Sequence, residues 1–241
     1  DTDPLSDGFN NVIDTDTDAL VINGIAVGDV PHTVAFSPDG TKAAVTNSGT
    51  TKVGYEGLVG TFRYTLSIID TTNYNIIKTI TGLGAIPRGV AFSPDGTKAY
   101  VTIRNEQTIW GTKAYYVRVF DTTTKYNQIA TIAVGGEPLA VAFSPDGTKA
   151  FVTNNDHRDP TGNTVSVIDT ANYKIITTIA VGNRPGAVAV SPDGNIAYVT
   201  NTWSGTVSVI DLRANAISSD SSDSSDSGDS GGGTDPGIFL N

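Results

Sequence analysis

The stretch SPDGTKAFVTNNDHRDPTGNTVSVIDTANYKIITTIAVG, residues 144–182, contains the pattern that decides the fold. Its opening tetrapeptide, Ser-Pro-Asp-Gly, occurs four times in the 241-residue chain, at 37–40, 93–96, 144–147 and 191–194. Proline presets φ in such a turn and glycine accepts a positive φ, so each copy predicts a tight turn between two strands. The chain is therefore built from a repeat of about 50 residues, a length typical of propeller blades.

Apolar runs surround each turn in the same order. A run such as LAVAFS precedes the turn, KAFVTN follows it, and runs of the types VSVIDT and IITTIAVG complete the repeat. These runs are short, rich in β-branched residues and partly alternating, which is typical of strands. Four strands per repeat, here named a to d from the inside outward, predict one blade of an all-β propeller.

The repeat resembles a known sequence family. The string SPDG-TKAYVT, followed after a loop by NTVSVIDT and then by KIITTIAVG, is similar to the YVTN β-propeller repeat of archaeal and bacterial surface-layer proteins. The resemblance covers roughly residues 19–213. It implies a propeller fold and an extracellular or cell-surface location in a bacterium or archaeon, but a fold does not fix an activity.

The number of strands predicts how the ring closes. Repeat four has strands a, b and c but no run that matches strand d, whereas DALVINGIAVG at 18–28 matches strand d and precedes the first strand a. We therefore expect an all-β propeller over residues 18–217, with four blades of four antiparallel strands closed by this N-terminal outer strand. Two alternatives remain: a fragment of a larger ring, since seven blades are expected for the surface-layer relatives, and an eight-bladed ring made by two chains.

The charge of the chain is concentrated at its ends. Asp and Glu number 25 against 15 Lys and Arg, and eleven of the acidic residues lie in 1–18 and 218–236, which contain no basic residue. An acidic chain without a basic patch does not favour nucleic-acid binding. No apolar run approaches the length of a membrane helix, so we expect no membrane insertion. The chain has no cysteine, which excludes disulfides and thiolate chemistry.

The acidic N-terminal segment, residues 1–17, resembles a calcium loop of the EF-hand or dockerin kind. Asp3, Asp7 and Asp14 fall at its first, fifth and twelfth positions, and Asp16 offers a further carboxylate. Calcium prefers six to eight hard oxygen ligands, and Gly8 at the sixth position permits the sharp turn. Leu5 departs from the pattern at the third position. The segment predicts a calcium site, with a solvated acidic lead-in as the alternative.

Long loops between strands b and c carry the exposed aromatic candidates. In a propeller these loops share one face with the loops between strands d and a. Aromatic and polar residues gathered there predict either a surface that recognises glycans or proteins, or a set of caps that pack on one another. The candidate residues are Tyr55, Phe62, Trp110, His157 and Trp203.

The sequence offers little catalytic chemistry. His32 and His157 lie in different repeats, and neither a nucleophile motif nor a phosphate-binding loop occurs. The repeated aspartates belong to turns on this interpretation. We therefore expect that the protein is not an enzyme. Lactonases and streptogramin lyases share propeller folds, so an enzyme of that type is the less favoured alternative.

The C-terminal segment predicts a connector. Residues 218–236 are rich in Ser, Asp and Gly, a composition that favours a flexible linker. Ile238, Phe239 and Leu240 then predict a short apolar strand within 237–241. This strand can fold back on its own propeller or add to an exposed sheet edge of a neighbouring copy, with a disordered tail or a linker cut from a longer chain as the alternative.

Together these features predict a non-enzymatic extracellular structural protein. It would be a surface-layer or filament subunit that associates with neighbouring copies through its termini, as a homo-oligomer or filament. The alternative is a propeller module that binds glycan or other surface proteins through its long-loop face.

Overall fold

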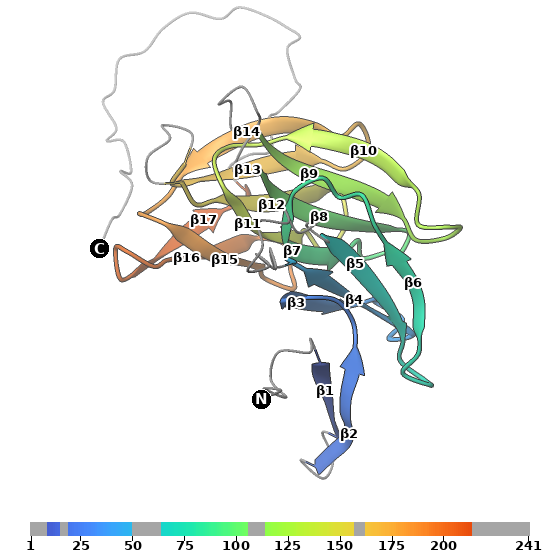
Figure 1. The fold of residues 1–241 in the computed structure, drawn as a ribbon. Coiled ribbons are helices and arrows are strands. Elements are labelled where there is room, and N and C mark those ends of the chain that lie inside the picture. Colours follow the sequence, from blue (N-terminus) through green and yellow to red (C-terminus); the bar gives the residue numbers. More distant parts are fainter. Residues whose placement is uncertain (1–8, 15–18, 50–63, 106–113, 157–161, 214–241) are drawn as a thin grey trace, which may run out of the picture.

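The computed structural model describes residues 9–14, 19–49, 64–105, 114–156 and 162–213, and these residues form seventeen strands without an α-helix. Fifteen of the strands form four antiparallel sheets in which sequence neighbours pair, as in a meander (Figure 1). Each sheet contains one Ser-Pro-Asp-Gly turn, between its first two strands. The prediction of an all-β fold with one blade per repeat is therefore confirmed.

The four blades follow one another along the chain. Blade one contains β3 (Pro31–Phe36), β4 (Lys42–Asn47), β5 (Thr65–Asp70) and β6 (Ile76–Ile80). Blade two contains β7 (Ile86–Phe92), β8 (Lys98–Asn105), β9 (Ala114–Asp121) and β10 (Gln128–Ala133). Blade three contains β11 (Pro138–Phe143), β12 (Lys149–Asn154), β13 (Thr164–Asp169) and β14 (Lys174–Ala180). Blade four contains β15 (Pro185–Val190), β16 (Ile196–Asn201) and β17 (Thr206–Asp211).

The repeated turn is held by its own side chains. Ser93 Oγ donates to the carboxylate of Asp95 at 2.5 Å, and the same carboxylate accepts from the backbone N–H of Thr97 at 3.0 Å. The other three copies make the equivalent bonds. Ser-Pro-Asp-Gly therefore specifies the turn through hydrogen bonds as well as through its proline and glycine.

The core lies between neighbouring blades. Blades one and two share a cluster that includes Leu66, Ile68 and Phe92, all at most 7% exposed. Blades two and three share a second cluster around Tyr100 and Val119, and blades three and four share a third. The sheets of blades two and three are thus apolar on both faces, because a neighbouring blade covers each face.

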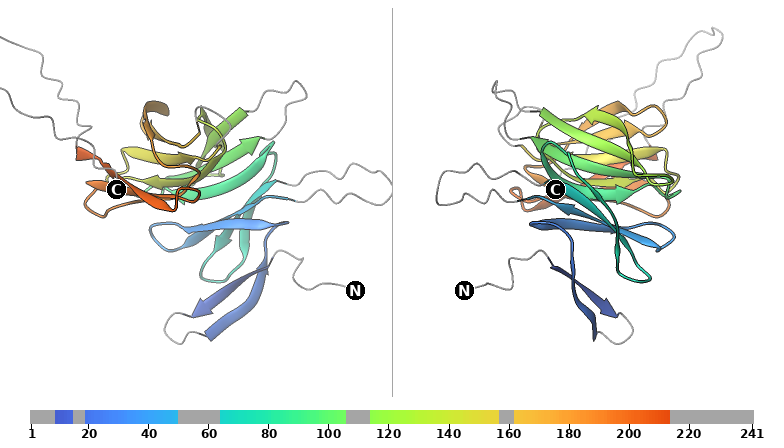
Figure 2. Two further views of the ribbon diagram at one scale, coloured as in Figure 1. Left: turned by 90° about the vertical axis from the view of Figure 1, so that its left-hand side faces the viewer. Right: turned by 45° about the vertical axis from the view of Figure 1, so that its right-hand side comes forward.

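The predicted closure by the N-terminal outer strand is wrong. Strand β2 (Ala19–Ala26) pairs antiparallel with β1 (Phe9–Asp14), whereas blade four remains a sheet of three strands ending at β17. The inner strands β3, β7, β11 and β15 contact one another in succession, but no comparable contact joins β15 to β3 among the described residues. The blades form an open arc, with blade one and blade four at its ends (Figures 1 and 2).

Strand β2 nevertheless lies where the outer strand of a preceding blade belongs. Ile25 and Val27 pack on Ala43, Val45 and Ile69 of blade one. In the same way, β10 of blade two and the residue after it pack on blade three through Ile132 and Val134. The N-terminal hairpin therefore occupies the place of strands c and d of a preceding blade. Strand β1 pairs with β2 as a strand c pairs with a strand d in blades one to three.

Candidate functional site at the open ends of the arc

An aromatic contact joins blades two and three. The Tyr100 ring of blade two meets the Phe143 ring of blade three edge-on, with 4.8 Å between ring centroids. Tyr100 is fully buried in this contact. Because Tyr198 and Phe36 occupy the equivalent positions in blades four and one, the two open ends carry the two halves of the same aromatic pair.

A repeated hydrogen bond crosses each internal blade boundary. The hydroxyl of a threonine on strand b donates to a main-chain carbonyl on strand a of the next blade. The three bonds run from Thr46 to Arg88 at 2.7 Å, from Thr102 to Leu139 at 3.0 Å and from Thr153 to Gly186 at 2.8 Å. All three hydroxyl groups belong to fully buried threonines. The halves of a fourth such bond are the exposed Thr200 and the carbonyl of His32, at opposite ends of the arc.

The outward face of blade four is apolar and exposed. Tyr198, Val207 and Val209 are 51%, 52% and 62% exposed, and the strand register places Tyr198 opposite Val209 on one face. The residues of blade three that correspond to the two valines are Val165 and Val167, which are at most 4% exposed. The difference arises because blade four lacks a following blade.

The outward face of blade one is its counterpart. Val34 and Phe36 alternate along β3 and are 56% and 66% exposed. Val90 and Phe92, which correspond to them in blade two, are 5% and 7% exposed because blade one covers them. Exposed large apolar side chains gathered on one face mark an interaction surface.

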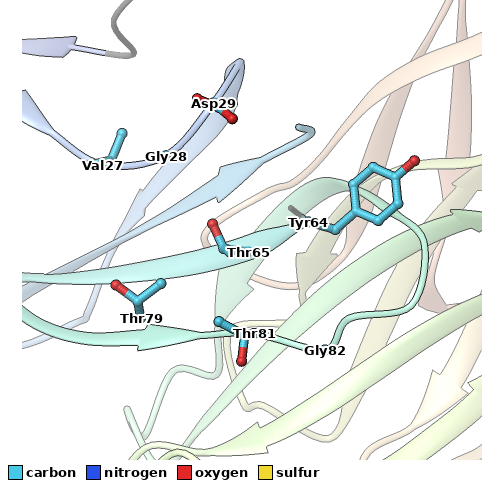
Figure 3. Close-up of a pocket in the computed structure, with 8 residues that line it drawn as sticks. All are labelled: Val27, Gly28, Asp29, Tyr64, Thr65, Thr79, Thr81 and Gly82. Atoms are coloured by element: carbon cyan, nitrogen blue, oxygen red, sulfur yellow. The ribbon is translucent and has the colours of Figure 1, made fainter. Parts of the chain in front are cut away.

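A pocket of about 510 Å³ lies where the segment after β2 passes the ends of β5 and β6 (Figure 3). Its lining contains small hydroxyl side chains, and its ionisable groups are the Asp29 carboxyl and the Tyr64 phenol. Figure 3 shows the Tyr64 ring extending away from the threonines that line the pocket. This lining provides no pair of groups suited to nucleophilic or acid–base catalysis.

Only part of the predicted loop-face site lies in the described residues. Trp203, after β16, is 58% exposed and lies under the Arg184 guanidinium, which is 4.0 Å from the ring centroid. Such a cation–π contact fixes the tryptophan on the loop face. Tyr55, Phe62, Trp110 and His157 lie outside the described residues, as do Asp3, Asp7, Asp16, Ile238, Phe239 and Leu240.

The calcium prediction is not tested by the structure. Asp14, its twelfth position, is the last residue of β1. In the part of the chain that the structure describes, no group of three or more acidic or histidine side chains is placed to hold a metal ion. The same part contains no helix long and apolar enough to cross a membrane.

The repeated aspartates accept hydrogen bonds from residues of their own turns. Hydrogen bonds from Ser37 Oγ and then from the backbone N–H and side chain of Thr41 lower the pKa of Asp39 to about 2. Asp70, at the end of β5, accepts from Thr72 N–H at 2.8 Å and closes the next turn. Both observations confirm that the repeated aspartates cap turns, as their positions in the repeat predict.

Sequence reasoning missed the interaction faces and strand β1. Tyr198 and Phe36 match core positions of the repeat, so comparing the repeats does not show that their blades stand at the ends of the arc. Strand β1 did have a signal, since Val-Ile-Asp-Thr at 12–15 repeats Val-Ile-Asp-Thr at 167–170 of strand c. Assigning residues 1–17 to an acidic lead-in hid that match.

Comparisons with known proteins support the fold. A solved structure of hydrazine synthase from Kuenenia stuttgartiensis is similar to this chain, with a TM-score of 0.70 and 20% sequence identity. The match covers 84% of this chain and 64% of that one, so the chain spans less than two thirds of the protein it matches. No known family model matches the sequence, and no curated protein matches it.

The fold and the blade faces define the class of this molecule. It is a β-propeller protein of four blades, open between blade four and blade one. The similarity to hydrazine synthase concerns the fold alone, because the identity is low. The resemblance to the YVTN repeat of surface-layer proteins stays a prediction.

Proposed function

We propose that this chain is a non-enzymatic extracellular structural protein, a surface-layer or filament subunit that binds neighbouring copies of itself. The observation that carries the proposal is the exposed apolar face of blade four, formed by Tyr198, Val207 and Val209. In blades one to three, the residues at the two valine positions are covered by the next blade. A subunit that meets a neighbour covers this surface in the same way.

The lining of the pocket supports a non-enzymatic role. Its one charged side chain is Asp29, which lies among threonines and glycines. The calcium site predicted at Asp3, Asp7, Asp14 and Asp16 is part of the proposal, since an ion there would stiffen the N-terminal end of the subunit.

A second candidate function is glycan or protein binding on the loop face. The observation that favours it is the exposed Trp203, held by Arg184 at 4.0 Å. An aromatic ring fixed in this way offers a flat apolar surface to a sugar or a side chain. A module of this kind works as a single chain, so its state of assembly separates it from a structural subunit.

Light scattering on the purified chain tests the proposed function. We expect the mass to rise above the 25.1 kDa of one chain as the protein concentration increases, with a larger rise in calcium than in chelator. A matched variant that ends at residue 217 shows whether the predicted C-terminal strand contributes. A single-chain mass at every concentration, with and without calcium, would contradict the structural role and favour the binding module.

A further inference from the structure

The two ends of the arc are complementary halves of one interface. Blade four presents Tyr198, the two exposed valines of β17 and the hydroxyl of Thr200. Blade one presents Val34 and Phe36 beside the carbonyl of His32. At each internal boundary, the equivalent groups pack together and form the threonine hydrogen bond. The end faces are therefore a continuation of an interface that the chain already forms three times.

We infer that the open face of blade four binds the open face of blade one in a second copy of this chain, so that two copies complete one ring of eight blades. This inference rests on the proposed function and specifies the partner and its surface. The apolar residues and the hydrogen-bonding groups at the junction all have internal counterparts with defined geometry. The C-terminal segment is not needed for this contact.

A second copy fits the open arc better than closure of the chain on itself. The three internal boundaries are already packed, with Tyr100, Val117 and Val119 fully buried at one of them. Closing four blades into a ring requires each boundary to open and repack, which costs buried apolar contacts. A second copy leaves all three unchanged and adds two boundaries of the same kind. Head-to-tail contacts that close in this way form rings, and eight blades lie within the usual range for propellers.

The junction also completes blade four. In the internal blades strand c pairs with strand d, as β13 pairs with β14 from Asp169 opposite Lys174. Strand β1 pairs with β2 in a similar register, from Asp14 opposite Ala19, and so occupies the place of a strand c. In the ring, β17 of the other copy takes that place beside β2, and β1 is displaced. The exchange keeps β2 paired and gives blade four its fourth strand.

Cysteine pairs across the proposed junction test the inference. A Cβ placed on Gly89 lies 3.1 Å from Cα of Ala140, so the two backbones are in direct contact across the blade boundary. Thiols at two such positions are within reach of a short bifunctional thiol reagent, which does not require the strict geometry of a disulfide. The equivalent residues at the ends are Ala187 and Thr33. The wild-type chain contains no cysteine, so Ala187→Cys and Thr33→Cys each introduce a single thiol.

We expect an equimolar mixture of the two single variants to form, on treatment with a short bis-maleimide, a cross-linked species of twice the 25.1 kDa chain mass. Neither variant alone forms it, because residues 187 of the two copies lie at different junctions. Replacing Thr33→Cys in the mixture by Lys78→Cys, at an exposed position on β6, provides the matched control and gives no cross-link. Light scattering before cross-linking checks that each variant assembles like the wild type.

The other outcomes overturn the inference in distinguishable ways. If the mixture does not react, but a single chain carrying both Ala187→Cys and Thr33→Cys is cross-linked within itself, the protein closes its own four-bladed ring. If the wild type assembles but the mixture gives no cross-link, the proposed function stands and the end-to-end contact is wrong. If the wild type stays a single chain at every concentration, both the proposed function and this inference fail.

Discussion

At the scale of single residues, the repeated threonine of strand b joins neighbouring blades. Thr102 accepts the N–H of Gly89 at 2.7 Å within blade two and donates to the Leu139 carbonyl of blade three at 3.0 Å. One buried hydroxyl thus satisfies two main-chain groups in different blades. Buried main-chain groups need such partners, so a small polar residue is required at this position.

Thr102→Val is expected to lower the free energy of unfolding by about 1–3 kcal/mol, because the substitution keeps the shape and leaves both buried main-chain groups without their partner. The matched variant Thr200→Val is expected to change the free energy of unfolding of the single chain by less than about 0.5 kcal/mol, since Thr200 is exposed. Urea unfolding of dilute protein measures both values. Equal losses for the two variants would contradict the role given to the blade boundary.

At the scale of elements, the turns explain why the repeat is visible in the sequence. Each Ser-Pro-Asp-Gly turn depends on a charged aspartate that accepts several hydrogen bonds. Hydrogen bonds from the Ser37 hydroxyl, then from the main-chain N–H of Thr41 and then from its hydroxyl, lower the pKa of Asp39 to about 2. The pKa values of Asp95, Asp146 and Asp193 are also lowered, with the serine hydroxyl as the largest cause.

These shifts predict a loss of stability in acid. A carboxyl whose pKa is lower in the folded chain stabilises it fully above its unfolded pKa of 3.8, and the contribution is lost as the pH falls towards about 2. The urea midpoint is therefore expected to be constant near pH 6 and to fall between about pH 4 and pH 2. Asp95→Asn, which cannot ionise, is expected to make that fall shallower. A midpoint that does not change over this interval would contradict the role of charged turn aspartates.

The elements also show how far the sequence determined the fold. The strands of the four blades and their turns could be predicted because glycine, proline and β-branched residues act locally in each repeat. The partner of β2 could not be predicted, because both β1 and β17 have the Val-Ile-Asp pattern of a strand c. Pairing between distant strands depends on the angles between blades, and these angles arise from packing rather than from the pattern of any one strand.

The exposed faces at the ends of the arc could not be predicted from the sequence, because they too depend on how the blades are arranged. Tyr198 and Phe36 follow the repeat and therefore look like ordinary core residues in the sequence. Their exposure follows only from the place of their blades at the ends of the arc. The loop residue Trp203 was predicted because loops carry variable aromatic residues, and it is exposed as expected.

At the scale of the whole molecule, the chain is half of a closed ring on our account. Its four blades share three packed boundaries and leave the two halves of a fourth open at opposite ends (Figure 2). A second copy supplies both missing halves at once. Two chains then bury the exposed apolar residues of both ends and keep the three boundaries inside each arc, while β1 gives up its place beside β2.

Single-particle imaging of the assembled protein tests this account most directly, because the number of blades can be counted in views along the channel. The account predicts class averages with eight blades around one channel, contributed by two chains. Rings of four blades, or open arcs of four blades at concentrations where the mass exceeds one chain, would contradict it.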